Sequence, residues 1–218
     1  MNVGIYSCAY RKLNKDILFY QKQVFNKFDL KINQVIIDKT PGKLKYQNKH
    51  GETLNNIIHN STEDYIVIFD VDCIPLNKSF YNTLLSQIKD GNTLSGGIGC
   101  ALHIDPTIAY IHPCFFGFKK SLYYDCGAPD LKADNHPWPG TTDTAQEFTN
   151  CCRKAGKKLK FWNVTDSRDT IWESVELNLK FGHGTIFEDS IYHQYEIRKT
   201  AQQTPFIQKC KEILASNN

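Results

Sequence analysis

The strongest constraint on the fold is a short apolar run that ends in two acidic residues. From Tyr65 to Phe69 every residue is aromatic or β-branched, and polar residues flank the run. Such a run predicts a strand buried on both faces, as in a parallel sheet. Asp70 and Asp72 follow it, and residues two apart on an extended chain point the same way. Both carboxylates can therefore converge on one divalent cation, which would offset the cost of burying them.

The segments before this run alternate between strand and helix patterns. They predict a strand, a helix capped by Asn14, a second strand and a second helix, at residues 3–8, 14–28, 31–38 and 51–60. This β-α-β-α-β order implies right-handed crossovers and a parallel sheet. We therefore expect an α/β fold, a three-layer α/β/α sandwich with a mostly parallel central sheet. Ligands bind such sheets at the carboxyl ends of the strands, where Asp70 and Asp72 would lie.

The second half has a looser pattern. Helices are expected at residues 80–88, 120–124 and 143–155, and strands at 93–103, 108–118 (interrupted by His112 and Pro113) and 158–164. A long loop, 126–142, is of the kind that often carries function. We expect a single domain over residues 1–218, with a nucleotide-binding half (about 1–92), an acceptor-side half (about 93–195) and a C-terminal helix (196–218).

Composition narrows the class of protein. A net charge of +3 is too small to indicate a nucleic-acid-binding protein. No segment approaches the roughly 20 apolar residues that cross a bilayer. The N-terminus lacks the pattern of a signal peptide, so we expect a cytoplasmic protein. The eight scattered cysteines contain no Cys-x-x-Cys pair and are expected to be reduced thiols, with disulfides or zinc as the alternatives.

The stretch Tyr65-Ile-Val-Ile-Phe-Asp-Val-Asp-Cys-Ile-Pro-Leu76 resembles the metal-binding strand of glycosyltransferases with the nucleotide-diphospho-sugar (GT-A) fold, including family 2. The order of elements is similar too, over roughly residues 2 to 195. The resemblance implies a Rossmann-like GT-A domain. It also implies Mn²⁺ or Mg²⁺ bridging the phosphates of a UDP- or GDP-type sugar nucleotide. The sugar would pass to a hydroxyl acceptor, expected to be a glycan.

The resemblance also implies roles for residues at the carboxyl ends of the strands. Asp72 would bind the metal directly, and Asp70 would contact the metal or the ribose. Tyr10 could stack on the base and Arg11 could meet a phosphate, although both also suit an ordinary surface loop. The nucleotide-binding residues are then Ser7, Cys8, Ala9, Tyr10, Arg11, Asp70 and Val71.

A third metal ligand and a catalytic base are also expected from the resemblance. The ligand would be a histidine near the C-terminal end, His193 by preference and His183 as the alternative. The base would be Asp143, which would deprotonate the acceptor hydroxyl. Aspartate at a helix start is also a common cap, and the usual Glu-Asp pair of family 2 is absent, so inversion and retention both stay open.

Aromatic residues near the expected acceptor side could stack on a sugar face. The candidates are Trp138, Phe115 and Phe116, although aromatic residues are more often simply part of the core.

Two other interpretations use the same residues. Asp70 and Asp72 also resemble the nucleophile and the acid/base of haloacid-dehalogenase-type phosphatases. That family normally continues Gly-Thr, places the motif in its first strand and has a later Gly-Asp pair, none of which occurs here. A non-catalytic module that binds sugar nucleotides or glycans is the second alternative.

Overall fold

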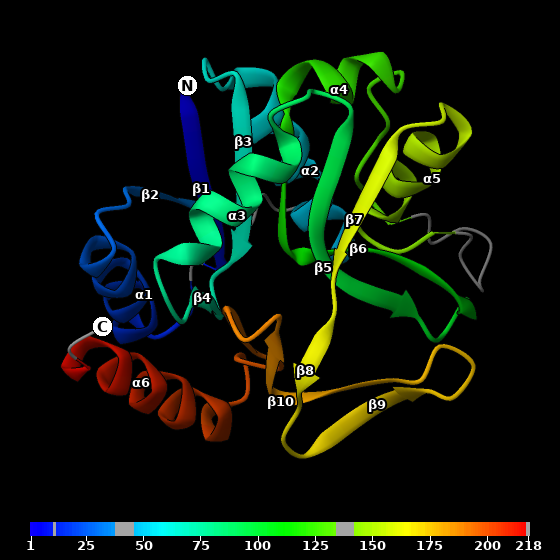
Figure 1. The fold of residues 1–218 in the computed structure, drawn as a ribbon. Helices are drawn as coiled ribbons and strands as arrows, with labels where there is room; N and C mark the ends of the chain where they lie inside the picture. Colours follow the sequence, from blue (N-terminus) through cyan, green and yellow to red (C-terminus); the bar gives the residue numbers. More distant parts are fainter. Residues whose placement is uncertain (11, 38–45, 134–141, 217–218) are drawn as a thin grey trace.

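The computed structural model describes residues 1–10, 12–37, 46–133 and 142–216. A six-stranded sheet with the order β2-β1-β3-β6-β5-β7 forms its centre (Figure 1). The bounds are β1 Val3–Tyr10, β2 Ile32–Ile37, β3 Tyr65–Asp70, β5 Thr93–Ala101, β6 Asp105–Lys119 and β7 Lys158–Trp162. β6 is antiparallel to its neighbours β3 and β5, and every other pair in this sheet is parallel. The prediction of a mostly parallel central sheet is confirmed.

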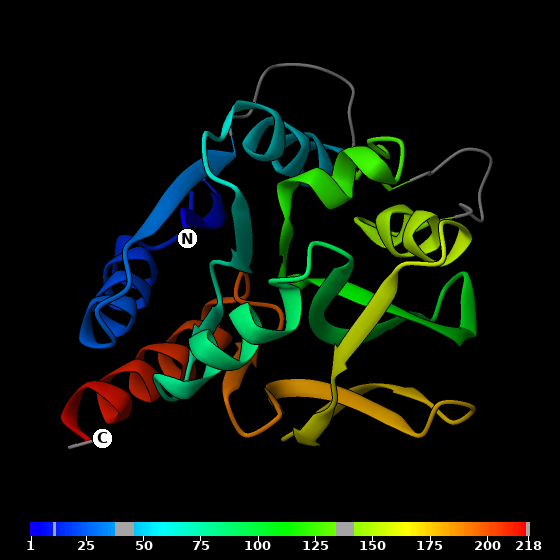
Figure 2. The ribbon, with the colours of Figure 1, turned by 45° about the horizontal axis from the view of Figure 1, so that its top comes forward.

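Helices cover both faces of this sheet, which confirms the three-layer arrangement. One layer consists of α1 Lys15–Lys27, α3 Ser79–Ile88 and α6 Thr200–Ala215, whose apolar residues join one core cluster. The other consists of α2 Tyr46–Asn60, α4 Lys120–Asp125 and α5 Gln146–Lys154, which join a second cluster. The C-terminal helix α6 packs beside α1, far from it in sequence (Figure 2).

The strand β3 lies between the two core clusters and contributes residues to each. Its residues alternate between the clusters, with Val67 and Phe69 in one and Ile66 and Ile68 in the other, all fully buried. The Phe69 ring lies 4.9 Å from that of Phe25 on α1. Burial on both faces explains why the sequence here is apolar without interruption.

Replacing Phe69 with Ala should destabilise the protein by about 3 to 5 kcal/mol, because the change removes a fully buried ring and leaves a cavity. Urea unfolding followed by circular dichroism measures this free energy. The control is Phe19→Ala, since Phe19 is 55% exposed and should change stability little. Equal effects of the two changes would contradict the central place of β3 in the core.

A second sheet, not predicted from the sequence, lies beside the first. Its order is β4-β11-β10-β8, and β9 also pairs with β10. The bounds are β4 Cys73–Pro75, β8 Val164–Asp166, β9 Thr170–Ser174, β10 Leu179–Phe187 and β11 Ile191–Gln194. Only Val71 and Asp72 separate β3 from β4, so the chain passes from the first sheet into the second at the acidic pair.

Three boundaries differ from the predictions for physical reasons. α2 continues N-terminal to Gly51, where an added Cβ would lie 2.4 Å from the Leu131 carbonyl oxygen, so glycine permits close packing there. β6 continues through Pro113. This proline lies where the β5–β6 register shifts, and at that point it has no paired residue for which its missing N–H would be needed. α5 begins at Gln146, not at Asp143, because Ala145 has a left-handed backbone (φ 62°).

None of the helices in the described residues is both long enough and apolar enough to cross a membrane.

Candidate functional site

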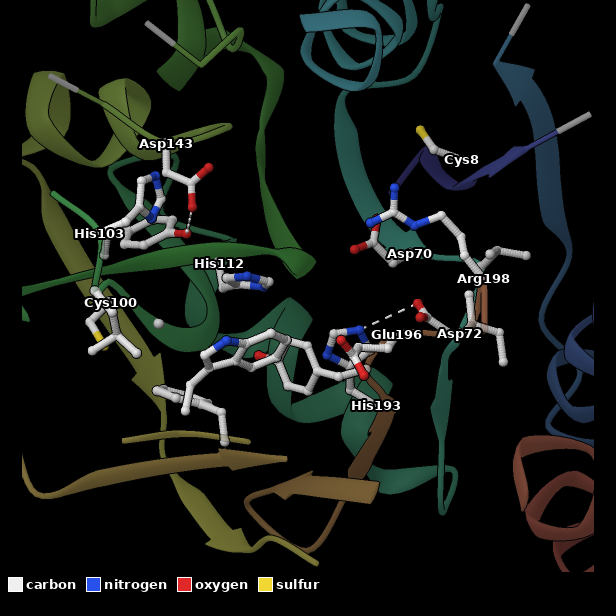
Figure 3. Close-up of a pocket in the computed structure, with 18 residues that line it drawn as sticks. Cys8, Asp70, Asp72, Cys100, His103, His112, Asp143, His193, Glu196 and Arg198 are labelled. Carbon is white, nitrogen blue, oxygen red and sulfur yellow. Dashed lines mark hydrogen bonds and ion pairs between the residues drawn. The ribbon is translucent and has the colours of Figure 1, made fainter. Parts of the chain in front are cut away.

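Two carboxylates and an imidazole converge where β3 ends. Asp70, Asp72 and His193 each offer a ligand atom, and these atoms lie within 4.8 Å of one another. His193 Nε2 is 3.3 Å from Asp72 Oδ1. His193 and Asp72 are buried, whereas 21% of the surface of the Asp70 side chain is exposed. Figure 3 shows the dashed contact between His193 and Asp72 at one end of a pocket.

Strand pairing in the second sheet produces this convergence. β11 runs antiparallel to β4 with His193 opposite Cys73, and the Gln194 N–H donates to the Asp72 carbonyl at 2.9 Å. On the other side, Gln21 of α1 donates its side-chain amide to the Asp70 carbonyl at 2.9 Å. β11 and α1 therefore both hold the short segment that carries Asp70 and Asp72.

A neighbouring histidine holds the first acid. His50 on α2 is buried, and its Nε2 lies 3.2 Å from Asp70 Oδ1. Burial alone would lower the pKa of His50, but the Asp70 carboxylate and the Cys8 side chain raise it well above its ordinary value. His50 therefore lies as a charge partner beside one oxygen of the Asp70 carboxylate.

The donor set fits a divalent cation. Burial raises the pKa of Asp72, opposed in part by His193, and a bound metal would offset the cost of burying this carboxylate. Carboxylate oxygens suit Mg²⁺ and Mn²⁺, and an imidazole is compatible with a transition metal such as Mn²⁺. His193 Nδ1 is buried, and the described residues provide it with no hydrogen-bond partner.

The site opens into a pocket of about 460 Å³. Asp70, Asp72 and Arg198 lie at one end, Asp143 at the other, and His112 between them (Figure 3). The Tyr110 hydroxyl donates to Asp143 Oδ2 at 3.1 Å.

Side chains in contact connect the two ends. The His112 ring is 5.8 Å from that of Tyr110 and 6.1 Å from that of His193. Burial and the nearby Asp143 carboxylate raise the pKa of Tyr110 well above its ordinary value, so Tyr110 remains a donor to Asp143. One pocket thus places the group of Asp70, Asp72 and His193 at one end and the Asp143 carboxylate at the other.

Comparison with known proteins gives the fold a name. No protein-family profile matches the chain, and no curated protein matches its sequence. The solved structure of the galactosyltransferase LgtC with donor and acceptor sugar analogues matches at a TM-score of 0.54 and 8% identity, over 99% of this chain and 98% of LgtC. A mutant of Drosophila β1,4-galactosyltransferase 7, in complex with manganese, UDP-Gal and xylobiose, matches at 0.51 and 13% identity, over 88% and 71% of the two chains. The chain has the GT-A fold.

The GT-A fold does not by itself identify the reaction. Identities this low show a shared fold, and the reaction has to be argued from the residues of the site.

Within this GT-A fold, the structure brings some of the expected residues together and separates others. Cys8 and Val71 line the pocket with the acidic pair, whereas Ser7 and Ala9 are buried and do not line it. His183 lies outside the group of Asp70, Asp72 and His193, with its Nε2 3.4 Å from Glu196 Oε2.

Of the aromatic candidates, Phe115 and Phe116 are buried in the two cores, so the structure supports the alternative that they are core residues and not a sugar face. Trp138, Arg11 and the side chain of Tyr10 lie outside the described part of the chain.

Sequence reasoning missed several residues in and beside this pocket. Tyr110 and His112 of β6 and Arg198 of the loop before α6 line the pocket, and His50 of α2 contacts Asp70. They come from three separate parts of the chain, so no local spacing connects them to the acidic pair. His50 had one usable signal, its place on the helix that leads into β3. The GT-A layout alone does not specify that this helix turns His50 toward Asp70.

Proposed function

We propose that the protein is a metal-dependent glycosyltransferase that moves a sugar from a UDP- or GDP-type sugar nucleotide to the hydroxyl group of a glycan. The observation that carries this proposal is the Asp70, Asp72 and His193 group at the carboxyl end of β3, in a pocket that presents Asp143 at its other end. A cation site and a separate carboxylate are what binding a diphosphate donor and activating a hydroxyl acceptor require.

At the donor end, Asp70, Asp72 and His193 would hold Mn²⁺ or Mg²⁺. The bound cation would take phosphate oxygens and neutralise charge on the departing diphosphate. His50 would keep the Asp70 carboxylate oriented. Arg198, whose side chain extends toward Asp70 in Figure 3, would contact a phosphate oxygen. Cys8 and Val71 line the pocket with the two acids, and β1 ends at Tyr10.

At the acceptor end, Asp143 would act as the general base. The acceptor oxygen forms a bond to the anomeric carbon, the bond from that carbon to the diphosphate breaks, and the nucleoside diphosphate leaves with the electron pair. The hydroxyl proton passes to Asp143, whose Oδ2 is oriented by the Tyr110 hydroxyl and whose Oδ1 accepts the Thr144 N–H.

Isothermal titration with UDP-galactose and GDP-mannose, with and without Mn²⁺, tests this function. We expect one of the two to bind only when the metal is present. If no nucleoside diphosphate sugar binds with Mn²⁺, the proposal fails. Cleavage of p-nitrophenyl phosphate with a fluoroberyllate adduct on Asp70 would indicate a phosphatase instead. Binding of donor and glycan without transfer or hydrolysis would indicate a binding module.

Replacing His193 with Ala should weaken Mn²⁺ binding at least tenfold, because a buried ligand beside Asp72 is lost. Titration with Mn²⁺, followed by the electron paramagnetic resonance signal of free Mn²⁺, measures the affinity. His183→Ala is the matched control, since His183 lies outside the ligand group. If His183→Ala weakens Mn²⁺ binding and His193→Ala does not, the ligand assignment is reversed.

A further inference from the structure

A large aromatic side chain is exposed inside the pocket. Of the large apolar side chains that are exposed in the described part of the chain, Trp172 alone lines this pocket, with 37% of its surface exposed. Burying an indole normally stabilises a protein, so an indole left accessible in a pocket indicates a face that a ligand can cover. Other residues are proposed to bind the donor, and Trp172 is not one of them.

The indole is held in a rigid setting. Trp172 lies on β9 and pairs across the hairpin with Phe181 of β10. At the far end of β9, the buried Ser174 hydroxyl donates to the Pro106 carbonyl at 2.7 Å. Just before β9, Arg168 donates to the Tyr192 hydroxyl at 3.2 Å. Hydrogen bonds thus hold the hairpin on both sides of Trp172. A ligand that packs on the Trp172 ring would therefore lose little affinity to the entropy cost of ordering this hairpin.

The position of Trp172 relative to the metal group is also defined. Its ring lies 5.1 Å from that of Tyr195, and the Tyr195 ring lies 4.0 Å from that of His193. Tyr195 also contacts His112, at 5.9 Å between ring centroids, on the side that leads to Tyr110 and Asp143. The Tyr195 ring therefore lies between Trp172 and His193, which is a proposed metal ligand. Trp172 also lines the same pocket as Asp143.

This combination of groups selects a chemical class. A flat aromatic face suits a ring with C–H groups on one side, and a carboxylate suits hydroxyl groups on its rim. A pyranose sugar has both features, whereas a lipid chain has no hydroxyl group to donate to the Asp143 carboxylate. Pockets that combine an aromatic wall with few polar groups bind such ligands in a defined orientation.

We propose that Trp172 is the stacking platform of the acceptor subsite and that the acceptor is a pyranoside, held with its C–H face on the indole and one hydroxyl at Asp143. This inference rests on the proposed function, because the donor end defines which ligand is the acceptor. It adds the acceptor class and the residue that recognises it.

Saturation-transfer NMR with methyl β-D-galactoside, methyl β-D-glucoside and methyl β-D-xyloside tests this inference. The protein is used with diamagnetic Mg²⁺ and UDP, and the ring C–H protons of at least one glycoside should receive saturation. Trp172→Ala should weaken binding of that glycoside about tenfold, whereas Trp172→Phe should retain most of the affinity because a ring face remains. Sorbitol, which has hydroxyl groups but no ring, should give no signal.

The matched control is Val175→Ala, which changes an exposed residue in the turn of the same hairpin and outside the pocket. It should bind UDP, Mn²⁺ and the glycoside like the unmodified protein, and all variants should bind UDP with Mn²⁺ equally. Equal glycoside binding by Trp172→Ala and the unmodified protein would overturn the inference. So would binding of UDP with Mn²⁺ but of no glycoside, and that result would leave the donor side intact. Failure of both UDP and GDP to bind with Mn²⁺ would overturn the proposed function as well.

Discussion

Asp72→Asn should reduce Mn²⁺-dependent binding of the donor nucleotide by at least a hundredfold. The residue is buried against His193 and is one of the two acids that face the proposed cation, so the neutral amide removes both a ligand and a charge. Asparagine keeps the volume of aspartate, which limits damage to packing at this buried corner. Titration calorimetry with UDP and Mn²⁺ measures the loss.

The control for this change is Asp166→Asn, which alters an exposed aspartate on β8 that does not line the pocket. It should bind nucleotide and metal normally. A thermal melt of each variant without metal shows whether the fold is intact. A folded Asp72→Asn protein with undiminished Mn²⁺-dependent binding would refute the role of the acidic pair.

The second large effect is expected at the other end of the pocket. Asp143→Asn should lower kcat by a factor of about 10² to 10⁴, because the acceptor hydroxyl loses its base. Binding of UDP with Mn²⁺ should be unchanged, because Asp143 and the acidic pair lie at opposite ends of the pocket (Figure 3). The rate is measured as nucleoside diphosphate released in the presence of a saturating acceptor.

Glu147→Gln is the matched control for this second change. Glu147 also lies near the start of α5 but does not line the pocket, so transfer should continue at nearly the normal rate. If Asp143→Asn keeps its kcat and loses affinity for the acceptor, Asp143 binds the acceptor but does not act as a base.

Local sequence patterns were sufficient for the donor half of the sheet. β1, β2 and β3, with α1 between the first two, occur near their predicted positions, because each has its own periodicity or apolar run. The acidic pair at the end of β3 could be found for the same reason. Its two members are neighbours in the chain, and their placement follows from the buried strand before them.

The small second sheet could not be found in this way. β4 and β8 are each three residues long, too short to show a period, and they form because β10 and β11 offer edges to pair with. The aromatic platform at Trp172 depends on this sheet. The sequence offered Trp138, Phe115 and Phe116 as candidates for stacking on a sugar, or else as core residues, and Phe115 and Phe116 do pack in the core.

By itself, the sequence determined that a buried strand ends in two carboxylates and that parallel βα units surround it, because both are properties of neighbouring residues. Only the tertiary structure decided which side chains join that pair. His193 and not His183 lies there, because β11 pairs with β4 in the register that sets His193 opposite Cys73. His50 reaches Asp70 because α2 packs against β1 and β2. Such contacts depend on strand register and helix packing between segments far apart in the chain, which no local spacing encodes.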